Sequence, residues 1–291
     1  MGILFVVNPV AGKGKSKDMA ETIKKICRDN NIEYEMVFTS KPKDATEIAR
    51  NAAKNGIERI IAVGGDGTVN EVLNGIVGTS CALGIVPSGS GNDFIRTINQ
   101  SKDMEKIIID NCRGNIRAID VGKCNGRYFV NIAGGGFDAL VVEETERVKK
   151  YFSGSMAYLV AVLTAFLKFK SVKVKIRVDD IEMEGDMLLT AVANGRYYGG
   201  GMLPAPKADI YDGLFDVYFI RNVSKAKFLR LAPGFMKGTL EGVEEVCYLR
   251  GKKVEIEANC EFFVNIDGEV ISRQKINFEI IPLGINIIVP E

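Results

Sequence analysis

The chain of 291 residues is 46% hydrophobic and 26% charged, a composition typical of soluble globular proteins, and its length favours two domains over one. Its 38 basic residues nearly balance its 37 acidic ones, so no net field favours nucleic acid as a partner. Histidine is absent, which excludes His–Ser and His–Cys relays and histidine metal ligands and leaves proton transfer chiefly to carboxylates.

The first part of the chain alternates between strand and helix patterns. Strand patterns occur at Ile3–Val7, Tyr34–Thr39, Ile60–Val63 and Leu83–Val86, and helical patterns lie between them at Lys17–Asn30, Ala45–Asn55 and Val69–Val77. Helices of this length between strands predict right-handed βαβ units and a parallel sheet. Ligands bind such sheets at the carboxyl ends of the strands, where we expect four loops to meet: those at Asn8, Thr39, Gly64–Thr68 and Pro87–Asp93.

The loop after the first strand, Asn8–Ser16, is rich in glycine and lysine. It is not a Walker A loop, because Pro9 stands where that motif needs its first glycine, and Lys17 replaces the third glycine of a G-x-G-x-x-G motif. By itself this loop indicates either a phosphate site or a solvated turn that caps the first helix.

Gly64–Thr68 is the more specific motif, with three glycines around Asp66 between a buried strand and a helix. Glycine lets the backbone come close to a ligand, and the amides at the start of the helix attract an anion. Asp66 can hold Mg²⁺ against that anion. Since a tight turn needs fewer glycines, the motif favours a phosphate site.

Two further turns add carboxylates. Pro87–Phe94 follows the next strand, opens a helix and supplies hydroxyls together with Asp93, a second candidate metal ligand, although a helix-capping loop would look the same. Asp120, in the segment Asp120-Val121-Gly122, ends another apolar run and adds a third acid, although isolated Asp-Gly-like turns are common.

Strand patterns dominate after about residue 124 and predict a mostly antiparallel second domain. We expect domains at 1–124 and 125–282, with the last strand, 283–291, able to pair in either. Two helical stretches, Ala139–Leu167 and Lys225–Gly238, interrupt strands at Arg127–Ile132, Lys173–Val178, Met187–Ala193, Phe215–Ile220, Lys253–Ala258, Phe262–Ile266, Ile276–Ile281 and Ile285–Val289.

Two acidic turns stand out in this second part. Asp209 and Asp212 precede a strand, where the carbonyl of Leu214 is also available, and oxygen-only ligands suit Mg²⁺ or Ca²⁺. A type I′ turn at Asp212-Gly213 explains the same residues equally well. The segment Asn265–Glu269 resembles a hairpin turn, yet its acidic pair is a reasonable place for a general base in a chain without histidine.

The apolar run Met156–Leu167 is too short to span a bilayer, which takes about 20 residues. A buried core helix is favoured over a membrane-facing helix whose following lysines meet anionic headgroups. The run Ile3–Val7 is too short for a signal core, and the six cysteines are scattered as expected of thiols in a reducing cytosol. We therefore expect a cytoplasmic protein.

Taken in order, these motifs resemble the bacterial diacylglycerol kinase catalytic-domain family of soluble lipid kinases, which is related to sphingosine kinases. The resemblance spans the chain through Asn8-Pro9 with Gly12, Gly64–Thr68, Pro87–Phe94, Gly199–Asp216 and Asp267-Gly268-Glu269. Gly64–Thr68 alone is shared with NAD kinases and phosphofructokinases. The resemblance implies an N-terminal Rossmann-like α/β nucleotide domain, a C-terminal antiparallel β-sandwich-like domain and a cleft between them.

The resemblance also implies ATP and Mg²⁺ as cofactors. The ATP site would comprise Asn8, Pro9, Val10, Ala11, Gly12, Thr39, Gly65, Asp66, Gly67, Thr68, Val69, Asn70, Glu71 and Ser90.

The same resemblance assigns roles to the acids. Asp66, Asp93 and Asp120 would form a water-linked network around the catalytic Mg²⁺, and Glu269 would be the general base. A second, structural Mg²⁺ would be held by a separate set: Asp209, Asp212 and the Leu214 carbonyl.

We therefore expect ATP-dependent phosphorylation of a hydroxyl on diacylglycerol or a related lipid. Membrane contact would be peripheral, and exposed strand edges would allow a homodimer. Two alternatives stay open: an NAD- or sugar-phosphate kinase of the same superfamily, and a non-catalytic nucleotide- or lipid-binding regulator.

Overall fold

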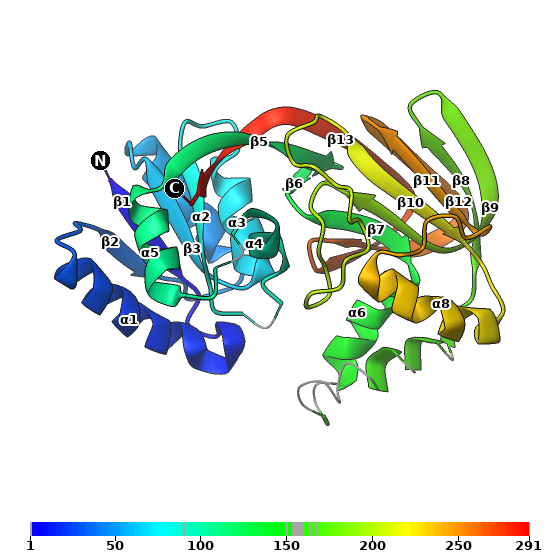
Figure 1. Ribbon diagram of the computed structural model, residues 1–291, viewed down its shortest axis with the longest axis horizontal. Helices are drawn as coiled ribbons and strands as arrows, with labels where there is room; N and C mark the ends of the chain where they lie inside the picture. The colour runs from blue at the N-terminus through cyan, green and yellow to red at the C-terminus, as the bar shows by residue number, and fades with distance from the viewer. Residues whose placement is uncertain are drawn as a thin grey trace.

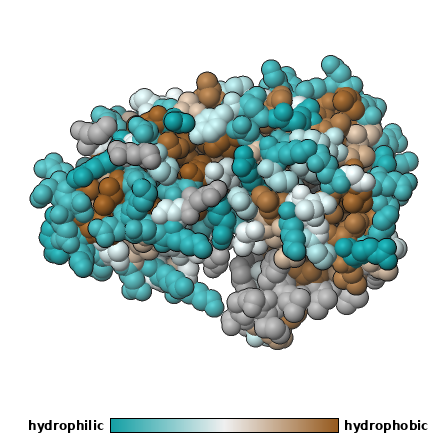
Figure 2. Space-filling view, viewed as in Figure 1, coloured by the Kyte–Doolittle hydropathy of each residue, from teal (hydrophilic) through white to brown (hydrophobic). Residues whose placement is uncertain are grey.

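The computed structural model describes residues 2–89, 91–99, 101–148, 151–152, 160–162, 164–166 and 168–290. An α/β part lies beside a β-rich part, and two long strands arch over both: β5 (Asn115–Cys124) and β13 (Glu269–Val289) (Figure 1). On the face seen in Figure 2, hydrophilic residues cover most of the surface and hydrophobic residues gather in a few patches.

The N-terminal part is built on a parallel sheet in the order β4-β3-β1-β2, so the predicted parallel pairing is confirmed. Its strands are β1 (Ile3–Val7), β2 (Glu35–Phe38), β3 (Arg59–Gly64) and β4 (Ala82–Pro87). Helices cover it: α1 (Lys15–Asp29), α2 (Asp44–Lys54), α3 (Asp66–Ile76), α4 (Asp93–Ile98) and α5 (Met104–Arg113).

Alternation along β1 supplies two separate cores. Ile3, Phe5 and Val7 pack with α1 and α5, whereas Leu4 and Val6 pack with α2 and α3. Because successive side chains of a strand point to opposite faces, a fully apolar strand is what a sheet covered on both sides requires.

The C-terminal part is antiparallel and closes on itself, as a β-sandwich-like domain does. Both β9 (Ile181–Ala193) and β12 (Lys253–Ile266) pair with β8 (Val172–Val178) at one end and with β7 (Ile132–Gly136) at the other. A register shift in β12 between Glu257 and Phe262 lets the strand bend from one layer to the other.

The rest of this part flanks the ring of strands. The strands β10 (Phe215–Arg221) and β11 (Val246–Gly251) continue the sheet beyond β9, and β6 (Arg127–Phe129) pairs with β5. The helices α6 (Phe137–Val148) and α8 (Lys225–Lys237) lie below the sheets in Figure 1, packed through Phe137 and Phe228.

Several element boundaries differ from the sequence prediction. The predicted strand Arg127–Ile132 divides into β6 and β7, and the predicted pairs of strands at 253–266 and 276–289 are each one continuous strand. In β13 the chain passes Pro282-Leu283-Gly284 as a bulge, with Leu283 at a φ of 50°, instead of ending there.

The last strand, whose pairing the sequence left open, serves both parts. It pairs with β12 over Glu269–Glu279, and Asn286 and Ile287 pair with β4. The remainder of the predicted helix 139–167 beyond α6 lies largely outside the described residues. No helix among the described residues is long and apolar enough to cross a bilayer.

Candidate active site

Three loops at the carboxyl ends of β1, β3 and β4 pack directly on one another. A Cβ on Gly12 would lie 2.0 Å from the carbonyl oxygen of Ser88, and the hydroxyls of Ser16 and Ser88 are 2.7 Å apart. A Cβ on Gly89 would lie 2.4 Å from the Cα of Gly65. These glycines are therefore required by contacts between loops.

The three glycines around Asp66 consequently differ in what they do. A Cβ on Gly64 would lie 2.3 Å from the hydroxyl of Thr68, and Gly65 faces Gly89, but a Cβ on Gly67 would meet nothing within 4 Å. Since no side chain caps the N-terminus of α3, an anion can bind beside Gly67.

Two other residues of the expected ATP site, Asn8 and Thr39, lie at the same edge of the sheet as this helix start. Asn8 Nδ2 donates to the hydroxyl of Thr68 over 3.1 Å. Thr39, which follows β2, donates its amide to the carbonyl of Val7, the last residue of β1. Glu71 instead points to α2, where its carboxylate accepts the amide of Lys43 over 3.0 Å. Ser90 lies outside the described residues.

Asp66 and Asp93 both approach Gly91. A Cβ on Gly91 would lie 2.6 Å from Asp66 Oδ2 and 3.4 Å from Asp93 Oδ2. Asp66 Oδ1 also accepts the amide of Asp93 over 2.8 Å, so it caps α4. Asp93 Oδ2 accepts the amide of Gly200 over 2.8 Å, a contact between the two parts of the chain.

The electrostatics of this pair fit a divalent cation. Burial, and to a lesser degree the charge of Asp66, raises the pKa of Asp93. Asp93 Oδ1 is buried and has no hydrogen-bond partner. A cation between the two carboxylates would relieve their repulsion and complete the coordination of that oxygen.

Asp120 is fully buried and makes a different set of contacts. Its carboxylate accepts the amide of Gly213 over 2.6 Å and that of Leu283 over 2.9 Å, which joins the acidic turn at 209–214 to the bulge of β13. Among the described residues, no three acidic or cysteine side chains converge closely enough to hold a metal ion directly.

The second predicted metal set lies in that acidic turn. Asp209 Oδ1 accepts the amide of Tyr211 over 3.1 Å, and Asp212 Oδ1 accepts that of Leu214 over 3.0 Å. Asp212 also forms an ion pair with Arg250. Nearby Asp216 is buried, and its Oδ2 lies 3.6 Å from Arg250 Nε, so a metal ion bound at this turn would share its carboxylate oxygens with Arg250.

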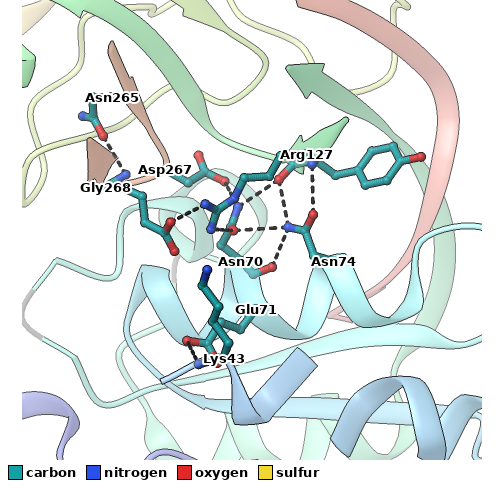
Figure 3. A network of polar contacts seen from close by, with 10 residues as sticks. Lys43, Asn70, Glu71, Asn74, Arg127, Asn265, Asp267 and Gly268 are labelled. Carbon is teal, nitrogen blue, oxygen red and sulfur yellow. Dashed lines mark hydrogen bonds and ion pairs between the residues drawn. The ribbon is translucent and has the colours of Figure 1, made fainter. Parts of the chain in front are cut away.

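Glu269 belongs to a polar network that joins the two parts of the chain, whose members Asn70, Arg127 and Asp267 are labelled in Figure 3. It pairs with Arg127, whose hydrogen bond and charge lower the pKa of Glu269. Arg127 Nη2 donates to Asn70 Oδ1 over 3.2 Å. Asn70 Nδ2 in turn donates to Asp267 Oδ2 over 3.1 Å and to the carbonyl of Tyr128 over 3.0 Å.

Three members of this network, Asn74, Arg127 and Asp267, were not among the predicted site residues. Asn70 and Asn74 lie one helical turn apart, so their spacing could have indicated a shared polar face on α3. Arg127 sits in a short strand pattern among many other basic residues, which carries no local signal. Asp267 lies two residues before Glu269 and belongs to the acidic pair considered for the general base, but only Glu269 received a predicted role.

The described surface has a hollow of about 710 Å³ elsewhere, between the β5–β6 and β8–β9 turns. Its walls include Lys123, Asp179, Asp180 and Lys253 and none of the predicted site residues.

Comparisons with known proteins agree with this two-part organisation. Residues 2–124 match the family model described as diacylglycerol kinase catalytic domain, and residues 131–289 match the YegS C-terminal NAD kinase beta sandwich-like domain. The chain is 30% identical to the diacylglycerol kinase of Bacillus subtilis (strain 168), over 91% of this chain and 88% of that one.

Further relatives cover nearly the whole length. The diacylglycerol kinase of Mycobacterium tuberculosis (strain ATCC 25618 / H37Rv) is 29% identical over 99% of this chain and 95% of that one. The crystal structure of a diacylglycerol kinase from Bacillus anthracis str. Sterne has the same fold, with a TM-score of 0.77 at 23% identity over 99% of this chain and 96% of that one.

Proposed function

The chain belongs to the diacylglycerol kinase family and is a lipid kinase, and on this premise we propose that it transfers the γ-phosphate of ATP to a hydroxyl of diacylglycerol or a related lipid. We assign the nucleotide to residues 1–124 and the lipid to residues 125–282. The observation that carries the proposal is the Asp66–Asp93 carboxylate pair beside the open helix start at Gly67.

In this mechanism the chain positions groups around a transfer that needs little covalent chemistry from protein. The amides at the start of α3 receive the phosphates, with Asn8 and Thr68 holding the adjoining loops in place. Asp66 and Asp93 would hold Mg²⁺, which when bound neutralises charge on the phosphates. Glu269 accepts the proton of the lipid hydroxyl, because its carboxylate is ionised at neutral pH.

A second Mg²⁺ at Asp209, Asp212 and the Leu214 carbonyl would have a structural role. Asp120 supports this assignment, since it ties the turn that holds these residues to β13. The metal would therefore stabilise the junction between the two parts of the chain.

Peripheral membrane contact would give access to the lipid. The helix α8 supports this idea with exposed Leu229 and Met236 seven residues apart, beside Arg230 and Lys237, and with no acidic residue in its sequence. Co-sedimentation with anionic vesicles should fall in Leu229→Ser/Met236→Ser and stay unchanged in the control Ile181→Ser, an exposed site on β9. Equal losses in both would remove α8 from this role.

The sheet edges β2 and β11 would allow a homodimer, which light scattering would detect.

The substrate class is tested by a screen with radiolabelled ATP. Diacylglycerol, monoacylglycerol, ceramide, sphingosine and polyprenol would be compared with NAD and sugar phosphates. We expect labelled product from one of the lipids. Transfer to NAD or a sugar phosphate alone, or to no acceptor, would contradict the proposal.

The role of Glu269 is tested by Glu269→Gln, which keeps the size of the side chain but cannot accept a proton. We expect kcat to fall by about 10²- to 10⁴-fold, the usual contribution of general base catalysis, while ATP affinity changes little. Unchanged turnover on the accepted lipid would remove Glu269 from this role without affecting the assignment of the nucleotide site.

A further inference from the structure

We propose that Arg127 is a positioning residue for phosphoryl transfer, which aims the Glu269 carboxylate and ties it to the helix that begins at the phosphate site. The proposal rests on Glu269 acting as the general base. It concerns how that base is held, and no predicted site residue supplies this role.

The guanidinium of Arg127 contacts two elements from different parts of the chain. Its Nη1 pairs with Glu269 Oε2 on β13, and its Nη2 donates to Asn70 Oδ1 on α3 over 3.2 Å (Figure 3). A planar guanidinium has donors in a fixed fork, so both contacts together define the position of the carboxylate relative to α3.

The backbone that carries Arg127 is itself attached to α3. On one side, β6 pairs with β5, so that Phe129 lies opposite Gly122, Tyr128 opposite Lys123 and Arg127 opposite Cys124. Toward α3, Asn74 Nδ2 donates to the carbonyl of Tyr128 and Asn74 Oδ1 accepts its amide, both over 3.0 Å. Asn74 therefore takes the place of a neighbouring strand and attaches β6 to α3.

The charged groups around this contact favour the same arrangement. Arg127 faces the carboxylates of Glu269, Asp267 and Glu71, and its pKa is raised mainly by its hydrogen bond with Glu269. Glu269 faces Arg127 and, more weakly, Lys43, and both cations lower its pKa. The side chains of Arg127 and Glu269 are 29% and 43% exposed, so the pair is partly screened from water yet open to a substrate hydroxyl.

The decisive measurement is the pH profile of kcat/KM for Arg127→Met and Arg127→Lys, using diacylglycerol in mixed micelles. Glu269 is active only when ionised, so activity falls as the pH falls through its pKa. In Arg127→Met we expect this acid limb to move up by about one pH unit, because the cation that lowers the pKa of Glu269 is removed. We also expect kcat to fall on the order of 10- to 100-fold, because the base is misplaced, with little change in the KM for ATP.

Arg127→Lys and one further variant, Arg177→Met, act as controls. Arg127→Lys keeps the charge but cannot reach both partners, so its acid limb should stay near that of the wild type while kcat falls. Arg177→Met removes an arginine that pairs with Glu182 on the outer face, and should leave rate and profile unchanged. If Arg127→Met does not fold, a wild-type kcat in Arg127→Lys would by itself overturn the proposal.

A double-mutant cycle with Glu269→Gln separates this proposal from the proposed function. If Arg127 acts through Glu269, Arg127→Met should add little to the loss already caused by Glu269→Gln. Fully additive losses would overturn the positioning role. Full activity of Glu269→Gln would reject Glu269 as the base, whereas loss in Glu269→Gln with a wild-type profile in Arg127→Met would reject only the role of Arg127.

Discussion

Asp267 has two carboxylate oxygens with opposite surroundings. Oδ2 accepts hydrogen bonds from Asn70 and from the amide of Val130 over 3.1 Å each, whereas Oδ1 is buried without a partner. Burial is the main cause that raises the pKa of Asp267 to about 7. The charged form of this residue is therefore tolerated poorly in a position next to the proposed base.

This environment predicts a pH dependence of stability. The folded pKa of about 7 lies above the ordinary value of about 3.9, so the folded protein binds the proton more tightly than the unfolded chain. The stabilisation is complete below about pH 4 and is lost as the pH rises through 7. Asp267→Asn is neutral throughout, so its free energy of unfolding should decline less than that of the wild type between pH 5 and 8.

Denaturant unfolding at several pH values checks this expectation. Asp44→Asn is a suitable control, because Asp44 is exposed and its hydrogen bonds with Ser40 lower its pKa, so it stays ionised over this range. Parallel curves for Asp267→Asn and the wild type would show that Asp267 does not titrate there.

At the scale of elements, α3 has a closely packed C-terminal end and an open N-terminal end. Near its C-terminus it lies against α2, where a Cβ on Gly75 would be 2.6 Å from the carbonyl oxygen of Thr46 and 2.8 Å from the Cβ of Ala49. At its N-terminus, a Cβ on Gly67 would meet no protein atom within 4 Å. Packing therefore requires glycine at position 75, whereas at position 67 only the proposed phosphate would be affected by a side chain.

Alanine substitutions at Gly75 and Gly67 should therefore have different effects. Gly75→Ala should lower the free energy of unfolding by about 1–3 kcal/mol through overpacking. Gly67→Ala should leave stability unchanged or slightly raised, but it should raise the KM for ATP on the order of 10-fold or more, because the methyl group enters the proposed phosphate space. Denaturant melts and steady-state kinetics measure both. An active, ATP-saturable Gly67→Ala with wild-type KM would argue against phosphate binding at this turn.

At the scale of the whole molecule, the two parts are joined by strands and by carboxylates. β5 and β13 run through both, Asp93 accepts the amide of Gly200, and Asp120 holds the turn at 209–214 against β13. A metal bound in that turn would add to the stability of the entire chain, because ligands that bind only the folded state favour it.

Mg²⁺ should therefore raise the melting temperature of the wild type relative to EDTA. A concentration of 100 times Kd corresponds to about 2.7 kcal/mol. Asp212→Ala should lose the part of this increase that comes from the turn at 209–214, and its melting temperature and activity should both be lower. A stable, fully active Asp212→Ala would contradict a structural metal at this turn.

Much of the fold could be predicted from local patterns. The apolar strands, the helices between them and the glycine-rich turns of residues 1–124 are properties of short segments, set by side-chain periodicity and backbone freedom. The family resemblance depended on the order of such motifs along the chain. Boundaries were less accurate where a bulge, as at Leu283, let a strand continue past residues that normally end one.

The sequence by itself determined the parallel α/β framework, the position of the glycine-rich turn for which phosphate binding is proposed, and the identity of the acids available for chemistry. Only the tertiary structure decided that Arg127 meets Glu269 from 142 residues away and that Asn70 bonds to Asp267 from 197 residues away. The reason is that periodicity reports which face of an element is buried, whereas polar contacts between distant segments depend on how those elements pack together.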